Sequence, residues 1–158
     1  MTATAVAFSS QISPVPLEPV EVATVRLAIA SESATITMVT TMATWCGACQ
    51  KELPQFELLR RRFEADEVAM HAIPVDPQDT KEKLDAYVAA HRPDYELIRG
   101  AAPPQITLVR RIVFSEIGID GLPATVVTDS SGRVLHVQAG VPTVSKVRQV
   151  LADLAVER

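Results

Sequence analysis

Apolar and polar positions alternate along this chain with two different periods, which predict strands and helices in turn. Residues 35–42 form an apolar, β-branched run that is typical of a buried strand. Residues 68–75 predict a second strand, and we expect Pro74 near its end or at a sheet edge, because proline cannot donate to a strand ladder. Pro54 lies inside the helix expected between them and predicts a kink. That helix is indicated by apolar residues at helical spacing, at Leu53, Phe56, Leu59 and Phe63.

The second half of the chain predicts three more helices and a hairpin. Residues 79–82 have the form of a capping box, which begins a helix that ends before Pro93. Pro104 suits the first turn of another helix, after a short extended piece and a turn. Two strands joined by a turn are expected at 124–128 and 133–138, followed by a last helix at about 143–156. This order predicts an α/β fold, a mixed sheet with helices on both faces.

The beginning of the chain has a different composition. Residues 1–20 combine small and polar residues with several prolines, which predicts a flexible N-terminal tail. Residues 20–29 are expected to add a strand at a sheet edge. A length of 158 residues suits a single domain, which we expect at residues 21–158.

Charge and hydropathy narrow the range of partners. The formal net charge of -4 argues against a nucleic-acid partner, which would require a basic face. No apolar run approaches the length of a transmembrane helix. The first residues lack the basic and apolar regions of a signal peptide. We therefore expect either a cytosolic protein or a chain from which a targeting segment is absent.

The chemistry of the chain centres on Cys46 and Cys49, its only cysteines. They are separated by two residues at the point where the strand gives way to a helix, whose N-terminus favours a thiolate over a thiol. A thiolate attacks disulfides, and the second thiol can resolve the mixed disulfide. A structural zinc site would need further ligands at close spacing, whereas the histidines are scattered, at His71, His91 and His136. The pair therefore predicts redox chemistry.

Two motifs resemble the thioredoxin superfamily, and most closely the thiol-disulfide oxidoreductases of the TlpA/ResA type. The first is residues 43–54, ATWCGACQKELP, where those proteins show A-T-W-C-x-x-C followed by a Glu and a helix-kinking Pro. The second is residues 121–127, GLPATVV, with Asp129 and Gly132 beyond it, which resembles the cis-proline loop, next strand and turn of the family. Together with the order of elements, the resemblance covers roughly residues 25–157.

The resemblance implies a thioredoxin-like mixed sheet flanked by helices, with a helical insertion between the C-x-x-C helix and the cis-proline strand. Cys46 would be the exposed nucleophile and Cys49 the resolving thiol. Pro123 would follow a cis peptide bond, and the backbone of Leu122 would pair with the substrate chain. The residues expected to contact the substrate are Trp45, which would also shield the disulfide, Gly47, Ala48, Leu122 and Pro123.

For the whole protein, the resemblance implies reduction of protein disulfides by dithiol exchange. The expected partners are protein thiol or disulfide substrates and a redox partner protein that supplies electrons, with neither a cofactor nor a metal. We expect a monomer at the periplasmic or extracytoplasmic face of a bacterial membrane, and a cytoplasmic location stays open. A thioredoxin-fold docking domain without turnover is an alternative.

The chain departs from thioredoxin at one important position. Thioredoxin has an Asp six residues before the first cysteine that helps to deprotonate the resolving thiol, and this chain has Thr40 there. Glu52 would serve as a proton acceptor if the kinked helix brings it back over Cys49. An ordinary solvated helix residue is the other interpretation of Glu52, and the sequence leaves both open.

A second family competes with this interpretation. Residues 75–80, VDPQDT, resemble a segment of Sco-type copper chaperones, which bind copper with two thiolates and a histidine. That histidine follows an Asp near the cis-proline region, where this chain has Asp120-Gly121, and the cysteines of those proteins are usually spaced by three residues. Met42 offers a thioether that suits Cu(I) in principle, although Met on a buried strand more often fills the core. The missing histidine favours the oxidoreductase.

Overall fold

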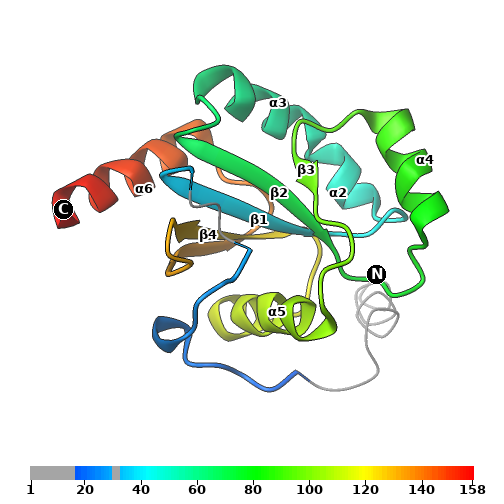
Figure 1. Cartoon of the computed structure of the whole chain (residues 1–158), viewed down its shortest axis with the longest axis horizontal. Coiled ribbons are helices and arrows are strands. Elements are labelled where there is room, and N and C mark those ends of the chain that lie inside the picture. The colour runs from blue at the N-terminus through cyan, green and yellow to red at the C-terminus, as the bar shows by residue number, and fades with distance from the viewer. Residues whose placement is uncertain (1–16, 30–32) are drawn as a thin grey trace.

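The structure is a computed structural model that describes residues 17–29 and 33–158 (Figure 1). Residues 1–16, the greater part of the expected tail, lie outside the described residues. The central element is a five-stranded mixed sheet in the order β3-β2-β1-β4-β5. Its strands are β1 (Ile36–Met42), β2 (Val68–Pro74), β3 (Glu96–Leu97), β4 (Ala124–Asp129) and β5 (Val134–Ala139). β1 pairs in parallel with β2, and β2 with β3, whereas β4 runs antiparallel to both of its neighbours.

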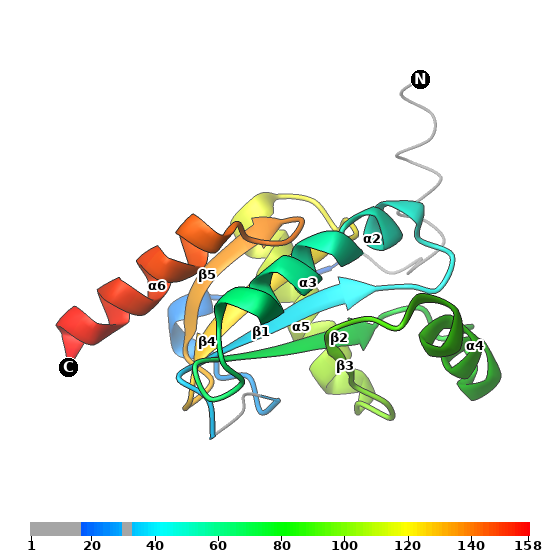
Figure 2. The same ribbon diagram turned by 90° about the horizontal axis from the view of Figure 1, so that it is seen from above.

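Helices cover both faces of this sheet, as the sequence predicts (Figures 1 and 2). On one face, α3 (Leu53–Arg62) and α6 (Val144–Glu157) pack on β1 through residues such as Phe56, Val147 and Met38. On the other face, α5 (Pro103–Ile117) packs through Val109 and Val113. The helices are η1 (a 3-10 turn, Val22–Thr24), α2 (Gly47–Lys51), α3 (Leu53–Arg62), α4 (Lys81–His91), α5 (Pro103–Ile117) and α6 (Val144–Glu157).

The β1 strand is buried along its whole length, which explains its continuous apolar and β-branched run. Its alternate residues belong to different apolar clusters. Met38 and Met42 lie on the face of the sheet that the cysteines share, and Val39 lies on the face that α5 covers. The carboxyl ends of β1 and β2 lie side by side, because Met42 pairs with Pro74. Pro74 is the last residue of its strand, as predicted.

The expected kink in the cysteine helix is confirmed as a break. α2 ends at Lys51 and α3 begins at Leu53, with Glu52 as the cap between them. Pro54 then lies in the first turn of α3, where its missing N–H costs little. The break places Glu52 at a corner between two helices instead of on a continuous helical face.

The prediction for residues 20–29 is wrong, since they form no edge strand. They contain the η1 turn and a single antiparallel bridge between Arg26 and Arg133. The segment is instead anchored on α5, where Ser115 Oγ accepts the Val20 N–H at 2.8 Å and Arg111 Nε donates to the Glu18 carbonyl at 2.7 Å. The contacts of this segment with α5 include residues 18–20.

Gly132 explains how this segment returns to the sheet. The Leu27 N–H donates to the Gly132 carbonyl at 2.9 Å, and a Cβ built on Gly132 would lie 2.3 Å from the Leu27 carbonyl oxygen. The φ of Gly132 is +88°, a conformation that favours glycine. The hairpin turn therefore requires glycine for the close approach of the N-terminal segment as well as for its own geometry.

Candidate active site

Cys46 and Cys49 form a disulfide at the start of α2, with 5.2 Å between their Cα atoms. Cys46 is the N-cap of the helix, and its Sγ accepts the backbone N–H of Cys49 at 3.1 Å. This N–H is one of the donors that a helix start leaves without a partner in the helix. In the reduced protein the same donor and the helix dipole favour a thiolate at Cys46.

Both sulfurs are buried, which corrects the expectation that Cys46 is exposed. The exposed fraction is 0% for Cys46 and 5% for Cys49. The disulfide belongs to the apolar cluster that contains Met42, and Leu122 packs against this cluster. A disulfide carries no charge, so burial among apolar groups costs it little. In this oxidised form the exposed positions beside it are Gly47, Ala48 and Trp45.

The segment before Cys46 is held by two carboxylates from the loop between β2 and α4. Asp79 accepts the backbone N–H of Thr44 at 2.8 Å and also the Thr44 hydroxyl. Asp76 accepts the indole N–H of Trp45 at 2.6 Å. The side chain of Gln50 donates to the Thr44 carbonyl at 3.2 Å. Thr44 and Trp45 are therefore held by hydrogen bonds to side chains and not by strand pairing.

Sequence reasoning missed the role of Asp76 and Asp79, although both lie in the segment that resembles a copper chaperone. The signal that could have found them is the parallel pairing of the two strands. Adjacent parallel strands end at the same edge of a sheet, so residues just after Met42 and just after Pro74 must meet there.

The loop on the other side of the disulfide contains the predicted cis peptide bond, between Leu122 and Pro123. The Pro123 carbonyl accepts the backbone N–H of Gly140 at 2.9 Å. Asp120, which precedes the loop, forms an ion pair with the nearly buried Arg110 of α5 through both oxygens. Because β4 runs antiparallel to β1, this loop lies at the sheet edge from which the chain continues to Cys46.

Thr40 occupies the buried position at which thioredoxin has an acid. Its hydroxyl lies 2.9 Å from that of Thr125, and the Thr125 hydroxyl donates to the Gly140 carbonyl at 2.7 Å. Since a hydroxyl has one hydrogen, Thr40 must be the donor to Thr125. The position is thus filled by a neutral chain of hydrogen bonds that has no free proton acceptor at its end.

Glu52 is half-buried at the corner between α2 and α3. Its backbone N–H donates to the Cys49 carbonyl at 3.2 Å. Its carboxylate lies against Gly140, whose Cβ, if present, would be 2.8 Å from Oε1. Glu52 therefore contacts the segment after β5, which is bonded to the Pro123 carbonyl through the Gly140 N–H, and its side chain is not on an exposed helical face.

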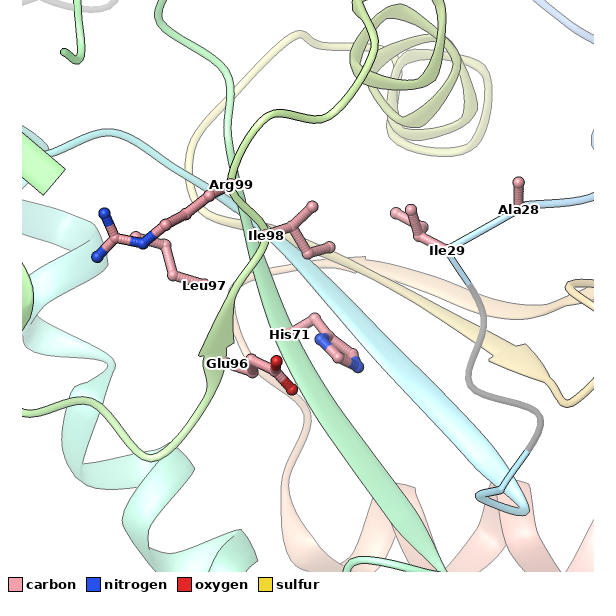
Figure 3. A pocket seen from close by; sticks show the side chains of 7 residues that line it. All are labelled: Ala28, Ile29, His71, Glu96, Leu97, Ile98 and Arg99. Carbon is pink, nitrogen blue, oxygen red and sulfur yellow. The ribbon is translucent and has the colours of Figure 1, made fainter. Parts of the chain in front are cut away.

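A hollow lies away from the disulfide, between β2, β3 and the N-terminal segment (Figure 3). His71 pairs with Val39 in the strand register and so shares the α5 face. Burial lowers the pKa of His71 below its ordinary value, and the charge of Glu96 opposes this shift. Figure 3 shows His71 and Glu96 side by side, with the Arg99 guanidinium turned away from them. His71 is separated from the disulfide by the sheet.

Among the described residues, no three or more His, Cys, Asp or Glu side chains gather where they would hold a metal ion. Met42, the possible copper ligand, is buried in the core cluster. None of the helices in residues 17–29 and 33–158 has the length and apolar character that crossing a membrane requires.

The sequence matches no model of a protein family and none of the curated proteins. Solved structures, by contrast, match over most of the chain. A thiol:disulfide interchange protein of the thioredoxin family from Chlorobium tepidum is 20% identical, with a TM-score of 0.53 over 78% of this chain and 81% of its own. StoA from Bacillus subtilis is 17% identical, with a TM-score of 0.55 over 75% of this chain and 83% of its own. The fold is the thioredoxin fold.

A thiol-disulfide isomerase from Corynebacterium glutamicum covers still more of the chain. It is 17% identical, with a TM-score of 0.55 over 88% of this chain and 95% of its own. At these identities the similarity concerns the fold. The thioredoxin fold brings most of the predicted site residues to one end of the sheet. The residues that follow β1 there are Trp45, Cys46, Gly47, Ala48 and Cys49, and the residues that precede β4 there are Leu122 and Pro123.

Proposed function

We propose that this protein is a thiol-disulfide oxidoreductase that reduces disulfides in other proteins through Cys46 and Cys49. The observation that carries the proposal is the pair itself, disulfide-bonded in a thioredoxin fold, with Cys46 as the N-cap of α2. A sulfur in that position receives a backbone N–H and the positive end of the helix dipole, which stabilise the attacking thiolate.

In the proposed reaction, the Cys46 thiolate attacks one sulfur of a substrate disulfide, and the other sulfur leaves as a thiolate. The Cys49 thiolate then attacks Cys46, which releases the substrate and closes the Cys46–Cys49 disulfide. The substrate gains two electrons and two protons, and the Cys46–Cys49 dithiol loses them. A partner dithiol protein restores the reduced form.

Glu52 is the proposed acceptor of the Cys49 proton. Two observations support this role. Its backbone is bonded to the Cys49 carbonyl, and the Thr40 position carries no carboxylate. A positioned general base typically contributes about 10²–10⁴-fold to a proton-transfer step.

The proposed substrate contacts are Trp45, Gly47, Ala48, Leu122 and Pro123. Trp45 has 37% of its surface exposed, and Gly47 and Ala48 are exposed as well. An exposed aromatic ring beside a buried disulfide offers apolar contact area to an unfolded or extended substrate segment. An extracytoplasmic location is proposed on the resemblance of residues 43–54 to the TlpA/ResA type.

The activity is tested by reduction of insulin with dithiothreitol as the electron source. The wild-type protein should accelerate precipitation of the insulin B chain, and Cys46→Ser should abolish the acceleration. His71→Gln, on the opposite face of the sheet, is the matched control and should retain it. A wild-type rate equal to that of dithiothreitol alone would contradict the proposed reduction of protein disulfides.

The two cysteine roles are tested by trapping. Cys49→Ser should accumulate a mixed disulfide between Cys46 and a substrate protein, because the resolving thiol is missing. Cys46→Ser should accumulate little, because Cys49 lacks the N-cap position that stabilises a thiolate. Mass spectrometry of the trapped species identifies the bonded cysteine, and a reversed pattern would show that the two roles are exchanged.

A further inference from the structure

Gly140, the residue after β5, contacts the candidate proton acceptor without belonging to the cysteine motif. We infer that Gly140 is a positioning residue: its missing side chain lets the Glu52 carboxylate lie against the backbone that follows β5, where the Gly140 N–H bonds the Pro123 carbonyl. The inference rests on the function proposed above, and it names a residue that the sequence motifs do not include.

The space beside Gly140 is the first observation. A Cβ built there would lie 2.8 Å from Glu52 Oε1 and 3.8 Å from Cδ. The first distance is too short for a carbon and an oxygen that are not bonded, so any side chain at this position must displace the carboxylate. The displaced group is the end of a flexible side chain, so the substitution moves Glu52 without forcing the backbone apart.

The backbone of Gly140 is the second observation, because it is fixed on both sides. Its N–H donates to the Pro123 carbonyl at 2.9 Å, and its carbonyl accepts the Thr125 hydroxyl at 2.7 Å. Thr125 is bonded in turn to Thr40 on β1. Gly140 therefore has a fixed position relative to the cis-proline loop and the central strands, and it can limit how far the Glu52 side chain extends.

Glu52 is fixed at its other end. Its N–H donates to the Cys49 carbonyl at 3.2 Å. Glu52 thus extends from the resolving cysteine to the segment after β5, and Gly140 determines the position of its carboxylate. The Thr40 hydroxyl donates to the Thr125 hydroxyl, and the Thr125 hydroxyl donates to the Gly140 carbonyl, which ends this row of hydrogen bonds. The same residue therefore completes the neutral chain and positions the carboxylate.

The chain offers a matched control for a substitution at Gly140. Gly140 has φ +71° and Gly100 has φ +69°, so an alanine meets the same backbone strain at either position. A Cβ on Gly100 would have nothing within 4 Å. Gly100→Ala therefore controls for an alanine at positive φ, and the double variant with Glu52→Gln isolates the contact with Glu52. Alanine also keeps the N–H and carbonyl that bond Pro123 and Thr125.

The experiment compares Gly140→Ala, Gly100→Ala, Glu52→Gln and the double variant Gly140→Ala/Glu52→Gln. Stopped-flow kinetics with a disulfide-bonded peptide measures the rate at which Cys49 resolves the mixed disulfide. Gly140→Ala and Glu52→Gln should each slow this step by about tenfold or more, within the ~10²-fold that a misplaced group can cost. Gly100→Ala should keep the wild-type rate. The double variant should be no slower than the slower single variant, because both changes remove one interaction.

A second readout is independent of turnover. The ¹³C resonance of the Glu52 carboxyl, assigned by its loss in Glu52→Gln, should move in Gly140→Ala and stay in place in Gly100→Ala. An unmoved resonance, additive rate effects in the double variant, or a wild-type resolution rate in Glu52→Gln would each overturn the inference. If the wild-type protein reduces no protein disulfide, the proposed function fails, and the carboxyl resonance still decides whether Gly140 positions Glu52.

Discussion

The two segments that flank the disulfide are held in place by different chemistry. Thr44 and Trp45, on the cysteine side, donate to the carboxylates of Asp79 and Asp76. On the proline side, Asp120 is held by the guanidinium of Arg110 through two bonds, one of them 3.2 Å between Nε and Oδ1. The first arrangement joins a charge to neutral donors, and the second joins two charges.

Burial makes this difference important. The side chains of Arg110 and Asp120 are only 9% and 16% exposed, whereas the bond from Trp45 to Asp76 lies at the surface. Water can replace a lost partner at the surface, but a buried charge that loses its partner has no substitute. The proline side should therefore govern stability, and the cysteine side should govern the local geometry of the site.

The largest expected effect follows from breaking the buried ion pair. Asp120→Ala leaves the Arg110 guanidinium buried and unpaired, which costs about 3–5 kcal/mol in the free energy of unfolding. Chemical denaturation measures the loss, with the exposed Asp94→Ala as a control that should change little. The double variant Arg110→Met/Asp120→Leu should recover most of the stability, because an apolar pair needs no partner. A loss below about 1 kcal/mol in Asp120→Ala would contradict the contrast between the two sides.

The features that the sequence predicts are those that depend on local patterns. The buried strand at 35–42 and the break near Pro54 follow from residue types and their spacing. The cis bond before Pro123 follows from a motif that resembles a known family. Each of these requires only residues that are near one another in the chain.

The features that the sequence leaves hidden depend on contacts between distant residues. Thr44 and Asp79 are 35 residues apart, and Val20 and Ser115 are 95 apart. No periodicity signals that Val20 is anchored on α5, so the edge strand expected at 20–29 is absent. The burial of Cys46 is likewise a result of tertiary packing, because the same motif in an isolated helix would be exposed. Gly140 has no side chain that a motif could mark, and its bonds to Pro123 and Thr125 and its contact with Glu52 are visible only in the structure.

An intermediate effect is expected on the cysteine side from Asp79→Ala. This variant removes the acceptor of the Thr44 N–H and hydroxyl, and a hydrogen bond to a charged group is worth about 1.5–3 kcal/mol. Because the site is half-buried and water can enter, we expect the lower end of that range in urea denaturation. Asp79→Asn keeps one carbonyl acceptor and should lose about half as much. Equal losses in the two variants would show that the negative charge matters more than the geometry of the two bonds.

The smallest effect on stability, and the most direct view of the site, is expected from Asp76→Ala. Its bond to Trp45 lies at the surface, so the free energy of unfolding should fall by less than about 1 kcal/mol. Trp45 is the only tryptophan, so the emission comes from this side chain and reports on its surroundings. Without its acceptor the indole should move more freely, and acrylamide should quench its emission more strongly than in the wild type. Asp76→Asn, which keeps an acceptor oxygen, should restore most of the protection, and Arg110→Met/Asp120→Leu should leave the quenching unchanged if the two sides are independent. Identical quenching in wild type and Asp76→Ala would mean that contacts other than the bond to Asp76 hold the indole, and Asp76 would then have no part in fixing the cysteine side.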